Sequence, residues 1–167
     1  MGHSLKRRFR DALIGITLAS VIGCGNVDKN LNHVYVPIGR VGYTENKTLV
    51  SEDFKYCNAL ILDSGDQALL AHALPGSTRL ASPYNAQTVV NYLLEDLEKH
   101  GMNPDSVEAI VNAGSERDLE LILGDLREKG IKVREASYDT SNGKYIRDVR
   151  YNPVTDDLSV TYDSQGG

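Results

Sequence analysis

Apolar and polar positions repeat with two different periods along the chain, and the change of period predicts its helices and strands. Between residues 85 and 100, apolar side chains recur at three- and four-residue spacing, which predicts an amphipathic helix that ends at Gly101. A similar stripe predicts a second helix over Asp118–Lys129, capped by Ser115 and stopped at Gly130.

Short runs rich in apolar and β-branched residues predict strands. The runs at 56–62 and 68–74 flank Asp63-Ser64-Gly65-Asp66, whose turn-forming residues predict a β-hairpin. A second hairpin is predicted around Asn152-Pro153. Strands are also predicted at 33–41, 107–111, 131–137, 144–151 and 158–162, the last two belonging to this second hairpin.

Strands before, between and after two helices predict an α/β fold, a single-domain layered sandwich of mixed β-sheets covered by two main amphipathic helices. A length of 167 residues suits one domain, which we expect at residues 33–163, with a tail at 164–167. The chain is 41% hydrophobic and 25% charged, which excludes a disordered, collagen-like or polytopic membrane protein. A net charge of −5 without a basic stripe argues against nucleic acid as a partner.

The first residues have the layout of a secretion signal. A basic cluster from Lys6 to Arg10 precedes the apolar run Ala12–Gly23, and Val21-Ile22-Gly23-Cys24 resembles the lipobox of secreted lipoproteins. This pattern predicts a signal segment at 1–23, lipidation of Cys24 and a tether at 24–32. We therefore expect a lipoprotein that faces outside the cytoplasm and contacts the membrane only through this lipid. The alternative is an amphipathic or buried helix of a cytoplasmic protein.

Cys57 and His72 are the residues from which chemistry is expected. If the predicted hairpin turns at 63–66, Cys57 and His72 lie directly opposite each other on one face. An imidazole at that distance can take the thiol proton and activate the sulfur as a nucleophile. The alternative is a cysteine that acts only as a small apolar side chain and a histidine that is a hydrogen-bonded interior residue.

Other reactive groups show no pattern that predicts a site. His3, His33 and His100 lack ligand-like spacing with cysteines or carboxylates, so neither a metal nor any other cofactor is expected.

Several segments resemble the chemoreceptor glutamine deamidases of the CheD family. Val50–Leu60 is similar to the family's active-site segment, in which a threonine lies six residues before the nucleophilic cysteine, and Ser51 stands at that threonine position. Ala71-His72-Ala73-Leu74-Pro75 resembles the segment of the catalytic histidine. Further landmarks follow in order at Pro83-Tyr84, 107–115, 130–133, Asp139-Thr140, 147–152 and Thr155, so that the resemblance spans residues 34–162.

This resemblance implies a hydrolase that converts protein glutaminyl side chains to glutamate and has a role in chemotaxis. Cys57 would be the nucleophile and His72 the base, with Ser51 orienting His72. Asn58 and Tyr56 would bind the substrate or its oxyanion. The hydrogen-bond donor to the oxyanion would be the backbone N–H of Cys57 or Asn58. The implied partner is a protein substrate, chemoreceptor-like in the family.

The segment before the cysteine departs from the family pattern. Glu52–Tyr56 replaces a glycine-rich approach, which implies a different loop and substrate entrance. The alternative function is therefore a catalytically altered protein-binding module with the same fold, anchored at the cell envelope. Another thiol hydrolase, such as a peptidase, is a third possibility.

Overall fold

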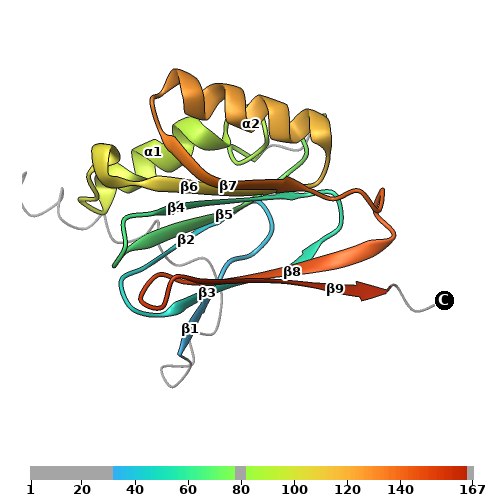
Figure 1. Cartoon of the computed structure of the whole chain (residues 1–167), viewed down its shortest axis with the longest axis horizontal. Coiled ribbons are helices and arrows are strands. Elements are labelled where there is room, and N and C mark those ends of the chain that lie inside the picture. The colour runs from blue at the N-terminus through green and yellow to red at the C-terminus, as the bar shows by residue number, and fades with distance from the viewer. Residues whose placement is uncertain (1–31, 78–81, 165–167) are drawn as a thin grey trace, which may run out of the picture. The chain divides into compact units, whose positions relative to one another are not determined.

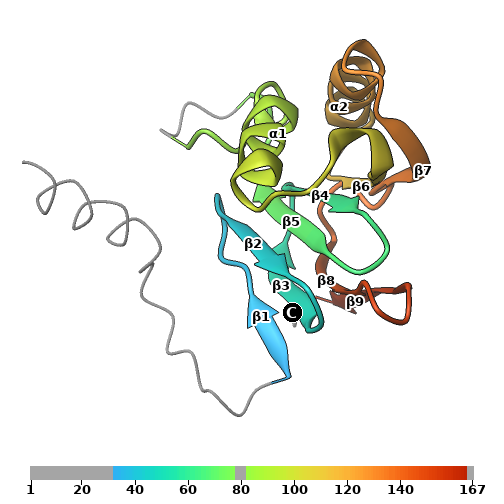
Figure 2. The same cartoon turned by 90° about the vertical axis from the view of Figure 1, so that its left-hand side faces the viewer.

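The computed structural model describes residues 32–77 and 82–164, which form two β-sheets stacked face to face (Figure 1). The five-stranded sheet has the order β2-β5-β4-β6-β7 and the four-stranded sheet has the order β1-β3-β8-β9. Helices α1 and α2 cover the outer face of the five-stranded sheet, which confirms the predicted α/β layered sandwich (Figures 1 and 2). None of the described helices is long and apolar enough to cross a bilayer.

The elements have the following bounds. The strands are β1 His33–Tyr35, β2 Val41–Thr44, β3 Thr48–Phe54, β4 Asn58–Asp63, β5 Ala68–Ala73, β6 Glu108–Ala113, β7 Lys132–Tyr138, β8 Tyr145–Asn152 and β9 Asp157–Ser164. The helices are α1 Val89–Lys99 and α2 Glu116–Glu128, with a 3₁₀ turn at Pro104–Ser106.

Strand β4 is buried along its whole length because both of its faces are covered. Leu60 and Leu62 pack toward the helices, whereas Ala59 and Ile61 pack toward the four-stranded sheet. Strand β5 alternates in the same way. Continuous apolar runs are the expected sequence pattern of strands buried on both faces, and they carry the core of this domain.

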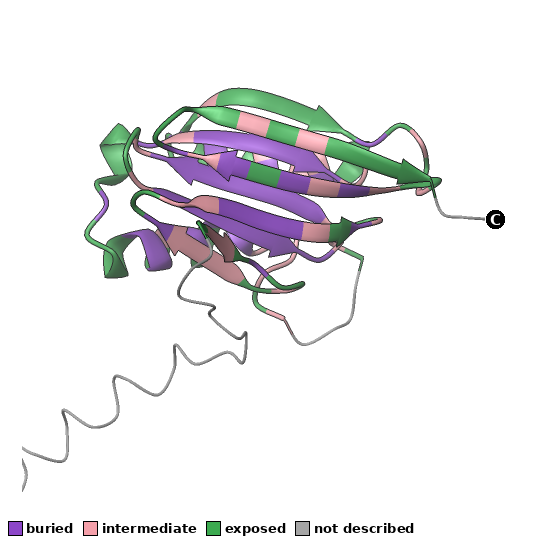
Figure 3. Ribbon diagram, turned by 90° about the horizontal axis from the view of Figure 1, so that it is seen from below, coloured by how far each residue is buried: buried purple, intermediate pink, exposed green. Residues whose placement is uncertain are grey.

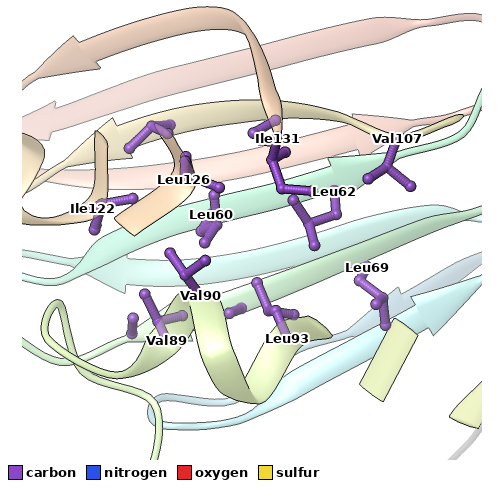
Figure 4. Packing of buried hydrophobic residues seen from close by; sticks show 14 of the residues in the cluster. Leu60, Leu62, Leu69, Val89, Val90, Leu93, Val107, Ile122, Leu126 and Ile131 are labelled. Atoms are coloured by element: carbon purple, nitrogen blue, oxygen red, sulfur yellow. The ribbon is translucent and has the colours of Figure 1, made fainter. Parts of the chain in front are cut away.

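The helices bury the stripes that the sequence predicted (Figure 4). Val89, Val90 and Leu93 of α1 meet Leu60 and Leu69 of the sheet, and Ile122 and Leu126 of α2 join the same cluster. Helix α2 begins as expected, because the Ser115 hydroxyl accepts the backbone N–H of Asp118 at 3.2 Å.

Predicted boundaries differ from the structure at two places that have an identifiable physical cause. Helix α1 starts at Val89 rather than residue 85, because the Asn85 side chain accepts the backbone N–H of Gln87 in a local turn. The run 33–41 is interrupted after Tyr35, where the chain turns through Gly39 with φ +69°.

Strand β3 was not predicted. It pairs in parallel with β1 and antiparallel with β8, and a bulge between Ser51 and Phe54 disrupts its alternation. At the opposite edge, β9 pairs with β8 in the predicted second hairpin, and its residues alternate between half-buried and exposed before the C-terminal end (Figure 3).

Residues 1–31 lie outside the described part of the chain. The predicted signal segment, the lipidation site at Cys24 and most of the tether fall there and stay predictions.

Candidate catalytic site

Cys57 lies between β3 and β4, and His72 lies on β5, the strand that pairs with β4, but the predicted register is wrong. His72 pairs with Ala59, because the hairpin loop spans 64–67 rather than 63–66 and is closed by the Ser64 N–H, which donates to the Gln67 carbonyl at 2.9 Å. Cys57 is thus displaced from the position opposite His72 by two residues. Cys57 itself precedes β4 and packs against the inter-sheet cluster that contains Ala59, the residue opposite His72.

Ser51 and His72 meet across the two sheets. The Ser51 hydroxyl on β3 lies 2.8 Å from Nδ1 of His72 and 2.6 Å from the Val36 carbonyl oxygen. A carbonyl can only accept, so the hydroxyl gives its one proton to Val36 and accepts the proton of Nδ1. This arrangement assigns the proton of the neutral imidazole to Nδ1 and leaves the lone pair on Nε2.

The Nε2 atom is the basic end of this imidazole. Within the described residues it is buried without a hydrogen-bond partner. The ring is held by the Phe54 ring, which stacks on it with centroids 3.7 Å apart and 10° between the planes. His72 is therefore fixed in tautomer and orientation, and its lone pair on Nε2 is not used by any hydrogen bond among the described residues.

The resting thiol and imidazole are both neutral. Burial raises the pKa of the Cys57 thiol from 9.0 to about 11, against a lowering influence of the Arg147 charge. Burial and the same charge lower the pKa of His72 from 6.5 to about 3. At neutral pH the site therefore holds a thiol and a free imidazole base, rather than the thiolate that proximity to His72 was expected to stabilise.

Arg147 closes the site from β8. Its fully buried guanidinium donates to the carbonyl oxygens of Cys57 at 2.7 Å, Ala113 at 3.0 Å and Phe54 at 3.3 Å, and also to the side-chain oxygen of Asn112. These bonds tie the segment that carries the thiol to the end of β6.

The side chain of Asn58 is used to hold the structure together. Its amide nitrogen donates to the Leu74 carbonyl at 3.2 Å and to Asp118 of α2 at 3.1 Å, and its oxygen accepts the Gly114 N–H at 2.8 Å. Asn58 thereby joins the start of β4 to the segments around it. Its predicted role in oxyanion binding stays a prediction for the backbone rather than the side chain.

Tyr56 borders the site and is 49% exposed. Its carbonyl lies so close to Gly114 that a Cβ there would come within 2.1 Å of the oxygen, and its ring lies against Gly143, where a Cβ would come within 2.4 Å. Two glycines far apart in sequence thus shape the loop that presents Cys57. The predicted contact of Tyr56 with substrate fits this exposed position and stays a prediction.

Sequence reasoning missed Arg147 and Phe54 as parts of the site. Arg147 shares the inward parity of Val149 and Tyr151 along the predicted strand 144–151. A charged residue among inward apolar positions is a signal that could have been noticed. Phe54 carried no such signal, because its ring reaches His72 only through the bulge in β3.

The described residues contain no group of three or more histidine, cysteine, aspartate or glutamate side chains that could hold a metal ion.

Comparison with solved structures yields a weak likeness. No known protein family matches the chain, and neither does any curated protein. The C-terminal domain of CNFy from Yersinia pseudotuberculosis aligns with a TM-score of 0.35 and 9% identity, over 79% of this chain and 62% of that one. The chain thus spans less than two thirds of that structure. At this level of likeness no function can be transferred, and the resemblance to the CheD family stays a prediction.

Proposed function

We propose that this protein is a thiol-dependent amidohydrolase that deamidates glutaminyl side chains of proteins. One observation carries the proposal: Ser51 holds the Nδ1 proton of His72, so that the lone pair on Nε2 is free, and Cys57 packs against the cluster that contains Phe54, whose ring stacks on His72. A nucleophile, a base and a third group that orients the base are the parts that covalent amide hydrolysis requires. The resemblance of residues 50–60 and 71–75 to the CheD family supplies the substrate class.

In the first half of the reaction, Nε2 of His72 takes the Cys57 proton while Sγ forms a bond to the carboxamide carbon. The carbonyl electrons move onto oxygen, and His72 then gives the proton to nitrogen. The C–N bond breaks, ammonia leaves and a thioester remains. In the second half, Nε2 takes a proton from a water molecule while the oxygen of that water bonds to the thioester carbon. The C–S bond breaks, the sulfur regains the proton, and glutamate is released.

Because the resting pair is neutral, proton transfer has to accompany the attack of the sulfur. A thiol with a pKa of about 11 contributes little free thiolate at neutral pH. The negative charge therefore forms mainly when the substrate is bound. Any oxyanion donor comes from the backbone in this proposal, as predicted for the N–H groups of Cys57 and Asn58.

The surroundings of the site suit a polypeptide substrate. Four tyrosines lie next to site residues in sequence or in strand pairing. Tyr56 precedes Cys57, and Tyr145 lies two residues before Arg147. Tyr162 on β9 pairs with Arg147 on β8, and Tyr138 on β7 pairs with Ala113 on β6. The four tyrosines are between 38% and 52% exposed. Exposed aromatic side chains with hydroxyl groups are frequent contacts for polypeptide partners.

Ammonia release from a glutamine-containing peptide tests the proposal, followed with a coupled ammonia assay. Wild type and the exposed control Ser159→Ala should release ammonia at equal rates, and Cys57→Ala and His72→Asn should release none. Equal release by wild type and Cys57→Ala would eliminate the thiol mechanism. Release of a peptide fragment instead of ammonia would identify the peptidase alternative.

A non-catalytic binding module is the second candidate function. The raised pKa of the thiol favours it, because such a thiol is weakly reactive at neutral pH. In that case no glutamine peptide releases ammonia, and Cys57→Ala binds its protein partner as tightly as wild type. The expected lipid on Cys24 would place either activity at a membrane surface.

A further inference from the structure

Arg147 has a bonding pattern that is unusual for a buried charge. The side chain is fully buried, and none of the ion pairs among the described residues includes it. Its partners are three backbone carbonyls and one amide oxygen, which are neutral. The opposing charge that acts on it most strongly is the buried carboxylate of Asp139, which favours the protonated guanidinium without forming an ion pair with it. Burying a charge that has no direct ion pair is costly, so a positive charge kept here requires a reason beyond filling space.

The carbonyl partners of Arg147 lie at both ends of the Cys57 loop, the segment of residues 55–57 between β3 and β4 that carries the thiol. Nε donates to Phe54 and Nη2 to Cys57, so one planar group spans the loop from the end of β3 to the start of β4. Nη1 donates to Asn112 and Ala113, which anchors the same plane to β6. Four of the five N–H groups of Arg147 are engaged in these bonds, and the guanidinium is fixed beside the thiol-bearing residue.

We propose that Arg147 is the positioning residue of this site: its guanidinium fixes the Cys57 loop, and its permanent charge stabilises the negative charge that develops on Sγ. The inference rests on the proposed thiol mechanism. Among the influences on the Cys57 pKa, burial is the largest and raises it, and the Arg147 charge is the strongest that lowers it. Burial, and after it the same charge, disfavours a protonated His72, so the base is neutral between turnovers.

No proton moves to or from Arg147 in this assignment. The thiol proton goes to Nε2 of His72, the negative charge stays on sulfur or passes to the substrate oxygen, and the guanidinium remains protonated throughout. The charge that stabilises the sulfur is thus permanent, whereas the charge of His72 exists only within the reaction.

Alkylation of Cys57 tests this role without any substrate. A Cys24→Ser background leaves Cys57 as the only cysteine, and each variant reacts with neutral iodoacetamide and with anionic iodoacetate below the thiol pKa. Arg147→Gln should raise the thiol pKa by about one unit, which slows iodoacetamide about tenfold. It should also lower the ratio of the iodoacetate rate to the iodoacetamide rate. Arg147→Lys keeps the charge and should keep that ratio close to wild type.

A merely structural role gives the opposite result. A loosened loop admits water to the thiol, which lowers its pKa and speeds alkylation by both reagents. Faster or unchanged alkylation in Arg147→Gln would therefore overturn the proposal. If this variant does not fold, the wild-type rate ratio is compared with that of the urea-unfolded chain. A higher ratio in the folded protein supports the proposal, and an equal or lower one refutes it.

The alkylation result is independent of the deamidase proposal. A charge-dependent rate ratio together with no ammonia release would retain Arg147 as the partner of the thiol and reject the proposed function. Ammonia release together with a charge-independent rate ratio would retain the proposed function and reject Arg147 as the partner of the thiol.

Discussion

The buried neutral imidazole of His72 makes the stability of this protein depend on pH in a defined direction. Burial, and then the charge of Arg147, lower the pKa of His72 from 6.5 to about 3 in the folded protein. Between these values the unfolded chain binds a proton at this residue and the folded chain does not. The free energy of unfolding therefore falls as the pH falls through this window.

The size of the effect follows from the two pKa values. At a pH of about 5 the imidazole of the unfolded chain is almost fully protonated, and that of the folded chain is still neutral. The linked loss relative to neutral pH is about 2 kcal/mol. An effect of this size is a large fraction of the roughly 5–15 kcal/mol by which domains are stable.

Urea unfolding of wild type and His72→Asn at neutral pH and near pH 5 measures this loss. An asparagine amide can still donate to the Ser51 hydroxyl but does not titrate, and the other ionisable groups are common to both proteins. Wild type should lose about 2 kcal/mol more than the variant on acidification. Equal losses would show that His72 titrates as freely in the folded protein as in the unfolded chain, and would refute the burial argument.

The remaining predictions concern the loop, the orienting hydroxyl and the N-terminal segment. Gly114→Ala should lower the free energy of unfolding in urea by about 1–3 kcal/mol, because the new Cβ meets the backbone of Tyr56. The control Gly124→Ala on α2 places its Cβ in open space and should be neutral or stabilising. Equal effects of the two substitutions would contradict the close approach at Gly114. Ser51→Ala should lower the free energy of unfolding by about 1–3 kcal/mol, since it strands the Nδ1 proton of His72, and unchanged stability would exclude that hydrogen bond. The intact mass of membrane-extracted protein should show a lipid on Cys24 and no residues before it, and an unprocessed chain would reject the lipoprotein prediction.

Most of the fold could be predicted from hydrophobic periodicity and turn-forming residues, because both depend on interactions between residues close together in the sequence. The stripe over Val89–Leu97 and the hairpin around Asn152-Pro153 lie where the apolar pattern placed them. Strand β3 was not predicted because Asp53, with φ +66°, lies in its bulge and Glu52 is acidic. In the sequence the segment therefore resembles a polar loop. Its pairing with β1 and β8 supplies the energy that local propensity lacks.

The site was predictable only in part for a related reason. His72 was a candidate from the predicted hairpin and Ser51 from the family resemblance, and the structure brings their polar atoms to 2.8 Å. The register of Cys57 depends on how the 64–67 loop closes, and a one-residue shift of that loop moves the pairing by two residues without changing the apolar pattern. Arg147 joins the site through carbonyls of three separate segments, and backbone acceptors leave no trace in the sequence.

In the proposed mechanism, Sγ of Cys57 carries the acyl group during turnover. Acid quenching of the enzyme with excess glutamine peptide, followed by intact mass and peptide mapping, tests it most directly. We expect an adduct of the peptide mass minus ammonia on Cys57, absent from Cys57→Ala and from His72→Asn. Ammonia release without any adduct, or an adduct on another residue, would contradict it.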